Sequence, residues 1–262
     1  MRQSYSNLKR VLQLPDLPAD YRPLKEPEFF AEGTGNSHWL ITSPVGKLVW
    51  RQFGSAPGAN HQDEIQLLTQ LQNQTWVPRL LLAVDNLGLL MHLAEGGHPL
   101  ADKLTTNQRQ SLIQLASQLW QMPLAEMNFP TTNYAKLLES YWQLAGKNLA
   151  TLPLLNKLIN QSQLWHNNSY RLTHHDLHGG NLLLNKKSLN NNEWILLDWE
   201  YAGLGNPWID AVSLDRFINL TTDEKAQLEA ALPPLAVYTN PWKEIGQWLA
   251  DLDLLWKQAI DA

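Results

Sequence analysis

The sequence predicts an α+β fold with two lobes, and three observations favour this class. Short apolar runs separated by turn signals occupy the first hundred residues, as in antiparallel strands. The hydrophobic period changes from two to about 3.6 after the glycines at 96–97, so helices dominate from there. Two further apolar runs, at 181–185 and 194–198, interrupt the helical part. We therefore expect a small N-terminal lobe (1–93) and a larger C-terminal lobe (94–262) that carries one β-hairpin.

The N-terminal lobe is expected to be an antiparallel sheet with one inserted helix. Its strand-like runs are HWLIT (38–42), KLVWRQF (47–53), RLLLAVD (79–85) and LGLLMHL (87–93). The stretch DNLG at 85–88 has the composition of a hairpin turn between the last two runs. Between the second and third runs, residues 61–74 place Ile65, Leu68 and Leu71 on one helical face. This spacing predicts a helix inserted into the sheet.

Helices are expected to make up most of the C-terminal lobe. Apolar residues recur at helical spacing along 107–121 and 134–145, and the segment 241–260 shows the same pattern. Pro207 and Pro241 each follow an asparagine, which is the order of an N-cap and a proline in the first helical turn. The two-glycine hinge predicts a cleft between the lobes, and clefts of this kind bind ligands.

Composition excludes several classes of protein. The chain has 262 residues and no cysteine, so disulfides, thiolate nucleophiles and sulfur-ligated metals are excluded. No stretch has the apolar length of a secretory signal or a membrane span, and a formal charge of −5 lacks the basic excess of nucleic-acid-binding proteins. We expect a cytoplasmic protein that binds neither membranes nor nucleic acid. Its acidic balance and 12 tryptophans suit a small cationic ligand.

The stretch LTHHDLHGGNLLLN at 172–185 contains the main candidate catalytic residues. The apolar runs at 181–185 and 194–198 are separated by polar residues and should pair as an antiparallel hairpin. In a hairpin the first residue of one strand lies near the last residue of the next, so Asn181 and Asp198 should be neighbours. An amide oxygen and a carboxylate are hard ligands, which Mg²⁺ takes together with substrate phosphates.

Asp176 lies five positions before Asn181, on the loop that leads into this hairpin. There it can face whatever the metal holds without being a ligand itself. Phosphoryl transfer needs a positioned nucleophile, a metal that neutralises phosphate charge and a group that accepts the proton of the attacking hydroxyl. The spacing of Asp176, Asn181 and Asp198 therefore predicts phosphoryl transfer, with Asp176 as the proton acceptor.

The histidines of the same stretch allow a second interpretation. His174 and His178 have the four-residue spacing of zinc-binding pairs, but that spacing requires a helix. The glycines at 179–180, followed by a strand, disfavour a helix there. We therefore expect His174 to bond to the backbone and fix the loop, and His175 to pack or to face solvent. A histidine-dependent metallohydrolase is the alternative from another class.

Two motifs resemble a known superfamily. HHDLHGGN at 174–181 resembles the H-x-D-x-H-x-x-N signature of aminoglycoside phosphotransferases and choline kinases, and ILLDWEYAG at 195–203 is similar to the D-W-E-Y continuation of the choline, ethanolamine and thiamine kinase branches. ESYWQ (139–143) and VWRQ (49–52) resemble bacterial thiamine kinases. The resemblance covers residues 30–260 and implies a bilobal protein-kinase-like fold, with ATP and Mg²⁺ as cofactors and the catalytic loop on the β-hairpin.

The resemblance also implies roles for individual residues. Asp176 would be the catalytic base, Asn181 and Asp198 the metal ligands, and Asp210 would brace the catalytic loop together with His174. Nucleotide contacts would come from Arg51 with its partner Glu64, from Gly35 in the loop EGTGNS, and from Met91 and Leu93 in an adenine-binding linker. Lys47 is a rival to Arg51. The loop at 32–37 lacks the full G-x-G-x-x-G pattern, and an arginine stands where protein kinases have lysine.

The implied acceptor is a compact cationic alcohol, namely thiamine, choline or ethanolamine. An aminoglycoside or another small molecule is the alternative within the superfamily. His178 and Glu200 are candidates to line the acceptor pocket, and Trp199 and Trp208 could stack a cation there or pack in the core. A non-catalytic pseudokinase is a further alternative, which the presence of all the residues needed for catalysis disfavours.

Overall fold

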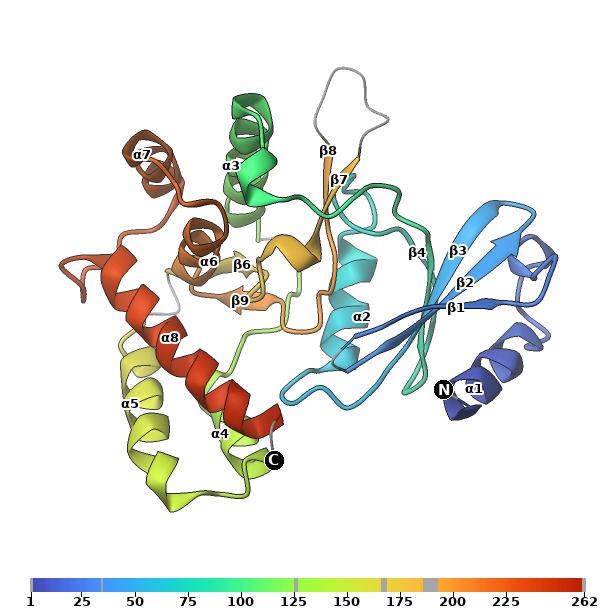
Figure 1. The fold of residues 1–262 in the computed structure, drawn as a ribbon, viewed down its shortest axis with the longest axis horizontal. Helices are drawn as coiled ribbons and strands as arrows, with labels where there is room; N and C mark the ends of the chain where they lie inside the picture. Colours follow the sequence, from blue (N-terminus) through green and yellow to red (C-terminus); the bar gives the residue numbers. More distant parts are fainter. Residues whose placement is uncertain (1, 34, 125–126, 166–168, 186–192, 261–262) are drawn as a thin grey trace.

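The computed structural model describes residues 2–33, 35–124, 127–165, 169–185 and 193–260. Figure 1 shows an antiparallel sheet at one end of the molecule and a mostly helical part at the other, with helix α2 (His61–Gln70) between them. This arrangement confirms the predicted α+β class, with a sheet-rich N-terminal part and a mostly helical C-terminal part. None of the described helices is both long and apolar enough to cross a bilayer.

The N-terminal sheet has five antiparallel strands in the order β1-β2-β3-β5-β4. The four expected strands and the turn at 85–88 are confirmed, and Asn60 caps the inserted helix α2 by accepting from the backbone N–H groups of Gln62 and Asp63. β1 was not predicted, because all five of its residues are exposed and show no alternation. The strands are β1 (Glu28–Glu32), β2 (Ser37–Ser43), β3 (Gly46–Gln52), β4 (Leu80–Val84) and β5 (Gly88–His92).

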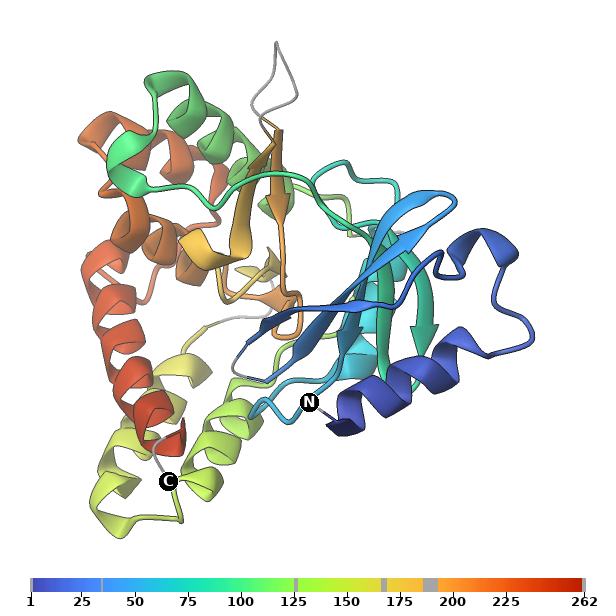
Figure 2. The ribbon, with the colours of Figure 1, turned by 45° about the vertical axis from the view of Figure 1, so that its right-hand side comes forward.

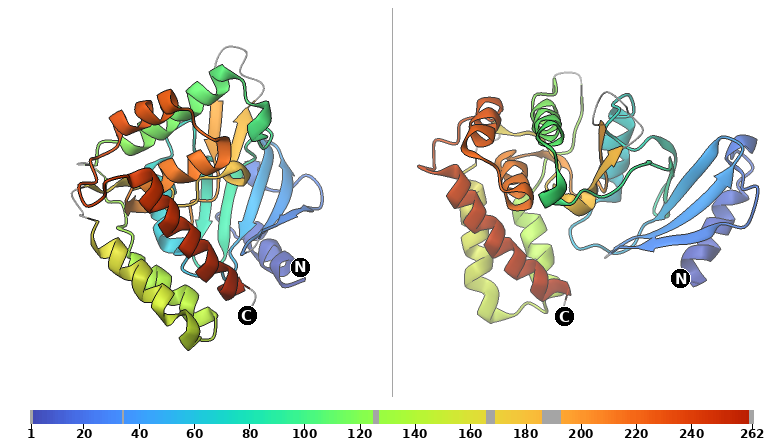
Figure 3. Two further views of the ribbon diagram at one scale, coloured as in Figure 1. Left: turned by 60° about the vertical axis from the view of Figure 1, so that its left-hand side comes forward. Right: turned by 45° about the horizontal axis from the view of Figure 1, so that its top comes forward.

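The outer face of this sheet is covered by an N-terminal helix that the sequence did not predict. Helix α1 (Arg2–Leu12), followed by the 3-10 turn η1 (Ala19–Tyr21), lies on the side of the sheet away from the helical lobe (Figure 3). Leu8 and Val11 of this helix pack against Trp39 and Trp50 of the sheet in a hydrophobic cluster of their own. The central strand β3 is therefore buried on both faces from Leu48 to Gln52.

The helical lobe matches the predicted periodicity. α3 begins with a capping box formed by Thr105 and Gln108, and Asn240 caps α8, which has Pro241 as its first residue. α4, α5 and α8 pack side by side (Figure 2). The helices are α3 (Thr106–Trp120), α4 (Tyr134–Leu144), α5 (Leu152–Gln163), α6 (Trp208–Ile218), α7 (Thr222–Ala231) and α8 (Pro241–Ile260), with 3-10 turns η2 (Ala101–Lys103), η3 (Leu149–Thr151) and η5 (Gly179–Asn181).

Two short ladders carry the loops of the candidate site. The predicted hairpin is confirmed as β7 (Leu182–Asn185) and β8 (Glu193–Leu196), with Leu182 opposite Leu196; its polar turn at 186–192 lies outside the described residues. A second ladder joins β6 (Arg171–Thr173) to β9 (Gly203–Gly205). Its strands are too short to give a periodic signal. Together the ladders bring the loop at 174–181 against the loop at 197–202.

The expected hinge between the lobes is held in place by β7. Gly97 and Leu184 exchange two backbone hydrogen bonds, of 3.2 and 3.0 Å. A side chain at Gly96 would meet the Leu184 carbonyl oxygen at 2.8 Å, so this close approach requires glycine. The linker is therefore tied to the strand that follows the catalytic loop.

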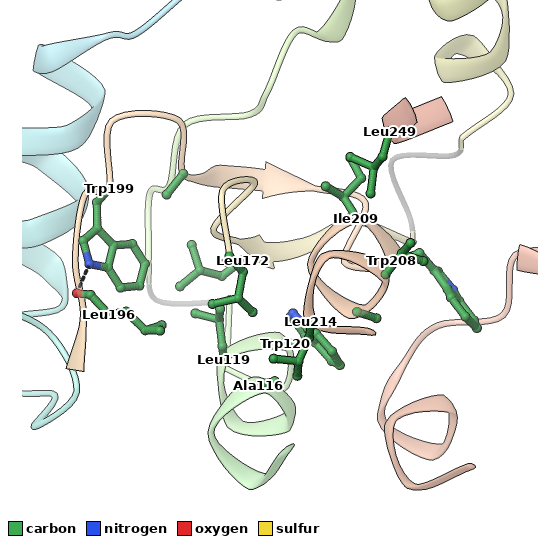
Figure 4. Packing of buried hydrophobic residues seen from close by; sticks show 14 of the residues in the cluster. Ala116, Leu119, Trp120, Leu172, Leu196, Trp199, Trp208, Ile209, Leu214 and Leu249 are labelled. Carbon is green, nitrogen blue, oxygen red and sulfur yellow. Dashed lines mark hydrogen bonds between the residues drawn. The ribbon is translucent and has the colours of Figure 1, made fainter. Parts of the chain in front are cut away.

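Tryptophans fill much of the core of the helical lobe. Figure 4 shows Trp120, Trp199 and Trp208 packed among leucine and isoleucine side chains from α3, α6, α8 and the two ladders. The indole N–H of Trp199 donates to the Leu196 carbonyl at 2.8 Å, and that of Trp208 donates to the Pro233 carbonyl at 3.0 Å. Each buried ring therefore has its polar atom satisfied.

Candidate active site

A cleft of about 990 Å³ opens between the two lobes. Its upper wall includes Gly35, Asn36 and His38 from the sheet and the loop that precedes β2. Its floor comes from the two loops supported by the ladders, and its far wall comes from α4, α6 and α8. Predicted site residues that line it are Gly35, Asp176, His178, Asn181, Asp198 and Glu200.

The catalytic loop is fixed from behind by Asp210 and His174. The Asp210 carboxylate on α6 accepts the backbone N–H of His174 at 2.7 Å and that of His175 at 2.8 Å. The His174 ring donates through Nε2 to the Leu197 carbonyl at 2.8 Å, which links this loop to the loop before Asp198. Both side chains are fully buried. This geometry matches the bracing roles expected for the two residues.

Asp176 opens into the cleft and is held by Asn181. The Asn181 amide nitrogen donates to Asp176 Oδ2 at 2.7 Å and to its backbone carbonyl at 3.0 Å. His178 Nε2 lies 3.5 Å from the same Oδ2. Burial raises the pKa of Asp176, but the hydrogen bonds and positive charge around it outweigh burial and lower that pKa below its usual value. Asp176 is therefore ionised at neutral pH and can accept a proton.

Asn181 and Asp198 lie at neighbouring positions of the hairpin, as predicted. The backbone N–H of Leu197 donates to the Asn181 carbonyl at 2.8 Å, and both side chains line the cleft. Because Asp176 takes the amide nitrogen of Asn181, the amide oxygen is the atom left to face a cation. Asp198 adds a carboxylate that is 37 % exposed. These hard oxygen donors fit Mg²⁺.

The described residues do not form a zinc site. In the part of the chain that the structure describes, no three His, Cys, Asp or Glu side chains gather in a metal-binding group. His174 is buried behind the loop, whereas the His178 ring accepts from the Gly180 N–H at 3.0 Å and faces Asp176. His174 and His178 therefore have different partners and do not form the pair that a zinc site would need.

Arg51 is the centre of a buried charge cluster that joins the lobes. Its guanidinium, 4 % exposed, pairs with Glu64 of α2, with Asp198, and with Glu200 at 2.9 Å. Burial would raise the pKa of Glu64, but Arg51 outweighs it and lowers that pKa. Lys47, the rival to Arg51, is exposed at the far end of β3. Arg51 is therefore the cation that faces the predicted metal ligand.

Glu200 ties this cluster to the loop at 32–37. Asn36 donates to Glu200 at 2.8 Å and accepts from the Gly54 N–H at 3.1 Å, so both ends of its amide are engaged. Burial and the negative charge of Asp198 raise the pKa of Glu200 to about 7. Glu200 lines the cleft, as expected, but its polar contacts are to the N-terminal lobe.

Trp199 and Trp208 do not lie where a cation-stacking role requires them. Trp199 is 1 % exposed and Trp208 is 5 % exposed, and neither lines the cleft. Both rings pack in the core. Trp199 follows Asp198, and its side chain points away from the cleft that Asp198 lines. Trp208 is the first residue of α6 and lies on the face of that helix that packs in the core. Met91 and Leu93 are also not among the described lining residues, and the Leu93 N–H donates to the Lys47 carbonyl at 3.0 Å. Their contact with adenine stays a prediction.

The cleft has an aromatic wall that was not predicted from the sequence. Tyr134 and Tyr141 of α4 and Trp248 and Trp256 of α8 line it. Tyr141 and Trp256 are inclined at 59° with ring centroids 5.0 Å apart, and Tyr134 meets Trp248 edge-on at 6.0 Å. Each pair of positions on one helix is separated by about two turns, so each helix presents both rings on one face. This spacing is visible in the sequence, but it is equally typical of rings that pack in a core.

Asp253 and Arg216 complete the helical side of the cleft. The Asp253 carboxylate on α8 lies 2.9 Å from the Arg216 guanidinium on α6, and both side chains remain partly exposed. A cation and an anion are thus placed beside the aromatic wall, where an acceptor molecule can reach either.

Partly buried histidines with lowered pKa values make the stability of the protein dependent on pH. Burial lowers the pKa of His175 to about 3, whereas an unfolded histidine titrates near 6.5. The neutral imidazole is thus favoured by folding, so its contribution is complete above pH 6.5 and is lost as the pH falls towards 3. Between pH 7 and pH 5 we expect about 2 kcal/mol of unfolding free energy to be lost through His175.

Urea unfolding of the wild type and of His175→Asn at both pH values measures this contribution. Asparagine tolerates a left-handed backbone and does not titrate, so the variant should lose about 2 kcal/mol less on acidification. His38, whose pKa burial lowers to about 4, stays in both proteins and cancels in the comparison. Equal pH dependence in the two proteins would contradict the assignment to His175.

Asp176, Asn181 and Asp198 line one cleft, and the buried Arg51, which is not among its described lining residues, pairs with Asp198. This arrangement suits phosphoryl transfer, and the comparisons with known proteins agree with that class. The model of the phosphotransferase enzyme family (APH) matches residues 26–239. The chain belongs to this family and is a small-molecule kinase. No curated protein sequence matches the chain significantly.

Solved structures share the fold at low sequence identity. The choline kinase LicA from Streptococcus pneumoniae has a TM-score of 0.67 and 13 % identity, with 98 % of this chain and 92 % of that chain covered. A choline/ethanolamine kinase family protein from Mesorhizobium loti gives 0.63 and 17 %, covering 98 % and 85 %. The GDP complex of an aminoglycoside 2'-phosphotransferase IIIa variant gives 0.65 and 20 %, covering 98 % and 91 %.

Proposed function

We propose that this protein transfers the γ-phosphate of ATP, with Mg²⁺, to the hydroxyl of a small cationic alcohol such as thiamine, choline or ethanolamine. The observation that carries the proposal is one shared cleft. The Asp176 carboxylate and the oxygens of Asn181 and Asp198 open onto its floor, and the rings of Tyr141 and Trp256 form its far wall. A molecule lying against this wall has its hydroxyl within reach of Asp176.

Asp176 acts as the general base. Its Oδ2 is engaged by Asn181, so Oδ1 accepts the proton of the acceptor hydroxyl. The acceptor oxygen then forms a bond to the γ-phosphorus while the bond from that phosphorus to the bridging oxygen breaks, and ADP leaves. Asn181 and Asp198 would hold Mg²⁺, which supplies positive charge to the phosphates. Arg51 adds a fixed positive charge next to Asp198.

The walls of the cleft support a small monocation as acceptor. Ring faces attract an ammonium or thiazolium ion. Asp253 stands beside the aromatic wall, where it pairs with Arg216 at 2.9 Å.

Four acids of the sequence could serve an aminoglycoside, namely Glu200, Asp210, Asp215 and Glu139. Glu200 lines the cleft but bonds to Arg51 and Asn36. Asp210 is buried behind the loop, Asp215 pairs with Lys225, and Glu139 is not among the described lining residues. A polycation would need more carboxylates at the wall, so an aminoglycoside is the second candidate.

The test is an ADP-release assay with Mg²⁺-ATP and a panel of thiamine, choline, ethanolamine, aminoglycosides and small sugars. We expect acceptor-dependent ADP release with a cationic alcohol and a phosphorylated product of the corresponding mass. Release only with an aminoglycoside would replace the proposed acceptor class. Stabilisation by ATP without ADP release would indicate a pseudokinase, and stoichiometric zinc in the purified protein would favour the metallohydrolase.

A further inference from the structure

The hydroxyl of Tyr134 joins three segments beneath the catalytic loop. Tyr134 is the first residue of α4, and its hydroxyl oxygen lies 2.8 Å from His175 Nε2 and accepts the backbone N–H of Asn206 at 2.8 Å. The strand end at Gly205 passes so close that a Cβ there would lie 2.3 Å from His175 Nε2 and 2.4 Å from the Tyr134 hydroxyl. A side chain at Gly205 would thus have to displace the Tyr134 hydroxyl or the His175 ring.

The Tyr134 hydroxyl makes one hydrogen bond of fixed direction and shares another with His175. Asn206 contributes an N–H, so the Tyr134 oxygen accepts from it. The donor in the bond to His175 Nε2 depends on the tautomer of the imidazole. Burial raises the pKa of Tyr134 well above its ordinary value and lowers that of His175 to about 3. The phenol therefore stays protonated and the imidazole stays neutral, so the hydrogen bond joins two uncharged side chains.

The bond acts on a strained residue next to the base. His175 has φ of 65°, in the left-handed region that side chains with a Cβ avoid, and it directly precedes Asp176. Such a conformation persists only where its surroundings impose it. Asp210 holds the backbone N–H of His175 and the Tyr134 hydroxyl holds its ring, so both ends of the strained residue are restrained.

We propose that Tyr134 is a positioning residue for the phosphotransfer reaction. Its hydroxyl keeps His175 in the left-handed conformation and thereby sets the direction in which the next residue, Asp176, presents its carboxylate. The inference rests on the proposed function, because the orientation of the Asp176 carboxylate affects the reaction only if Asp176 accepts the proton. It assigns Tyr134 no contact with the reacting atoms.

Tyr134 also lines the cleft, so a direct contact with the acceptor is the competing explanation. The two explanations predict changes in different kinetic constants. Loss of a positioning bond lowers kcat and leaves the KM for the acceptor nearly unchanged, whereas loss of a binding contact raises KM.

The first variant is Tyr134→Phe, which removes only the hydroxyl. We expect kcat to fall about 10- to 100-fold, the scale on which small misplacements of a catalytic group act, with KM values for ATP and acceptor within about twofold. Tyr170→Phe is the matched control, because that ring meets Tyr134 edge-on at 6.2 Å and its hydroxyl bonds to neither His175 nor Asn206 among the described contacts. Thermal unfolding checks that each variant is folded.

The second variant tests the route through His175. Glycine adopts a left-handed backbone without strain, so His175→Gly removes both the conformation that needs restraint and the ring that Tyr134 holds. We expect Tyr134→Phe to lower kcat at least about fivefold less in the His175→Gly background than in the wild type, which is the coupling that contacting residues show.

Each outcome decides the inference. A raised acceptor KM with unchanged kcat, or effects of the two substitutions that simply multiply, would overturn it. If the wild type is active and Tyr134→Phe has the same kcat and KM, this inference is overturned and the proposed function is not. A wild-type protein that releases no ADP, with any acceptor or with water, would remove the proposed function and this inference together.

Discussion

Asp176→Asn is expected to lower kcat by about 10²- to 10⁴-fold, the usual contribution of a general base, while Mg²⁺-ATP still binds. Asparagine keeps the size of the side chain and can still accept the Asn181 amide N–H that holds Asp176 at 2.7 Å. It cannot take the proton of an alcohol. Steady-state kinetics for turnover and calorimetry for Mg²⁺-ATP binding measure the two effects separately.

The matched control for Asp176→Asn is Asp223→Asn, because it makes the same chemical change at an exposed position in the first turn of α7. We expect wild-type kinetics from that control. Normal turnover by Asp176→Asn would mean that another group accepts the proton, and loss of Mg²⁺-ATP binding would mean that Asp176 acts as a ligand.

Asp198→Asn is expected to weaken the Mg²⁺-dependent part of ATP binding by at least the roughly 10- to 100-fold that loss of partners around a metal costs. The substitution removes the carboxylate charge but keeps a side chain that tolerates the left-handed backbone of Asp198, where φ is 60°. Arg51 still faces Glu64 and Glu200, so its buried charge stays neutralised. The lost affinity can then be assigned to the metal.

The measurement is ATP binding with Mg²⁺ and with a chelator, for the wild type, Asp198→Asn and Asp176→Asn. Mg²⁺ should strengthen binding to the wild type and to Asp176→Asn and should have little effect on Asp198→Asn. An unchanged magnesium response in Asp198→Asn would place the metal elsewhere.

Most elements with a strong period were predicted from the sequence, but α1 was missed although its apolar residues Tyr5, Leu8 and Leu12 recur at helical spacing. β2 to β5, α2, α3, α4 and the hairpin β7–β8 all show alternation or a helical stripe, and all are present. β1 has five exposed residues, and β6 and β9 have three residues each, too few to establish a period. These missed strands matter, because β6 and β9 position the catalytic loop.

The floor of the candidate site was predictable and its far wall was not. A hairpin brings together residues at its two ends, so the spacing of Asp176, Asn181 and Asp198 in the sequence was enough to predict that they lie close together. Trp199 and Trp256 carry no such information, because a tryptophan among leucines looks the same whether its ring faces a core or a cleft. The fold buries Trp199 and turns Trp256 towards the cavity.

Helix α8 lies beyond residue 239, where the match to the phosphotransferase enzyme family ends. The matched segment thus contains the predicted base and metal ligands but leaves out Trp248, Trp256 and Asp253, which line the cleft on its helical side. Relatives grouped by that segment share a reaction without having to share a substrate. Assigning substrates within such a group requires comparison of the helix that follows it.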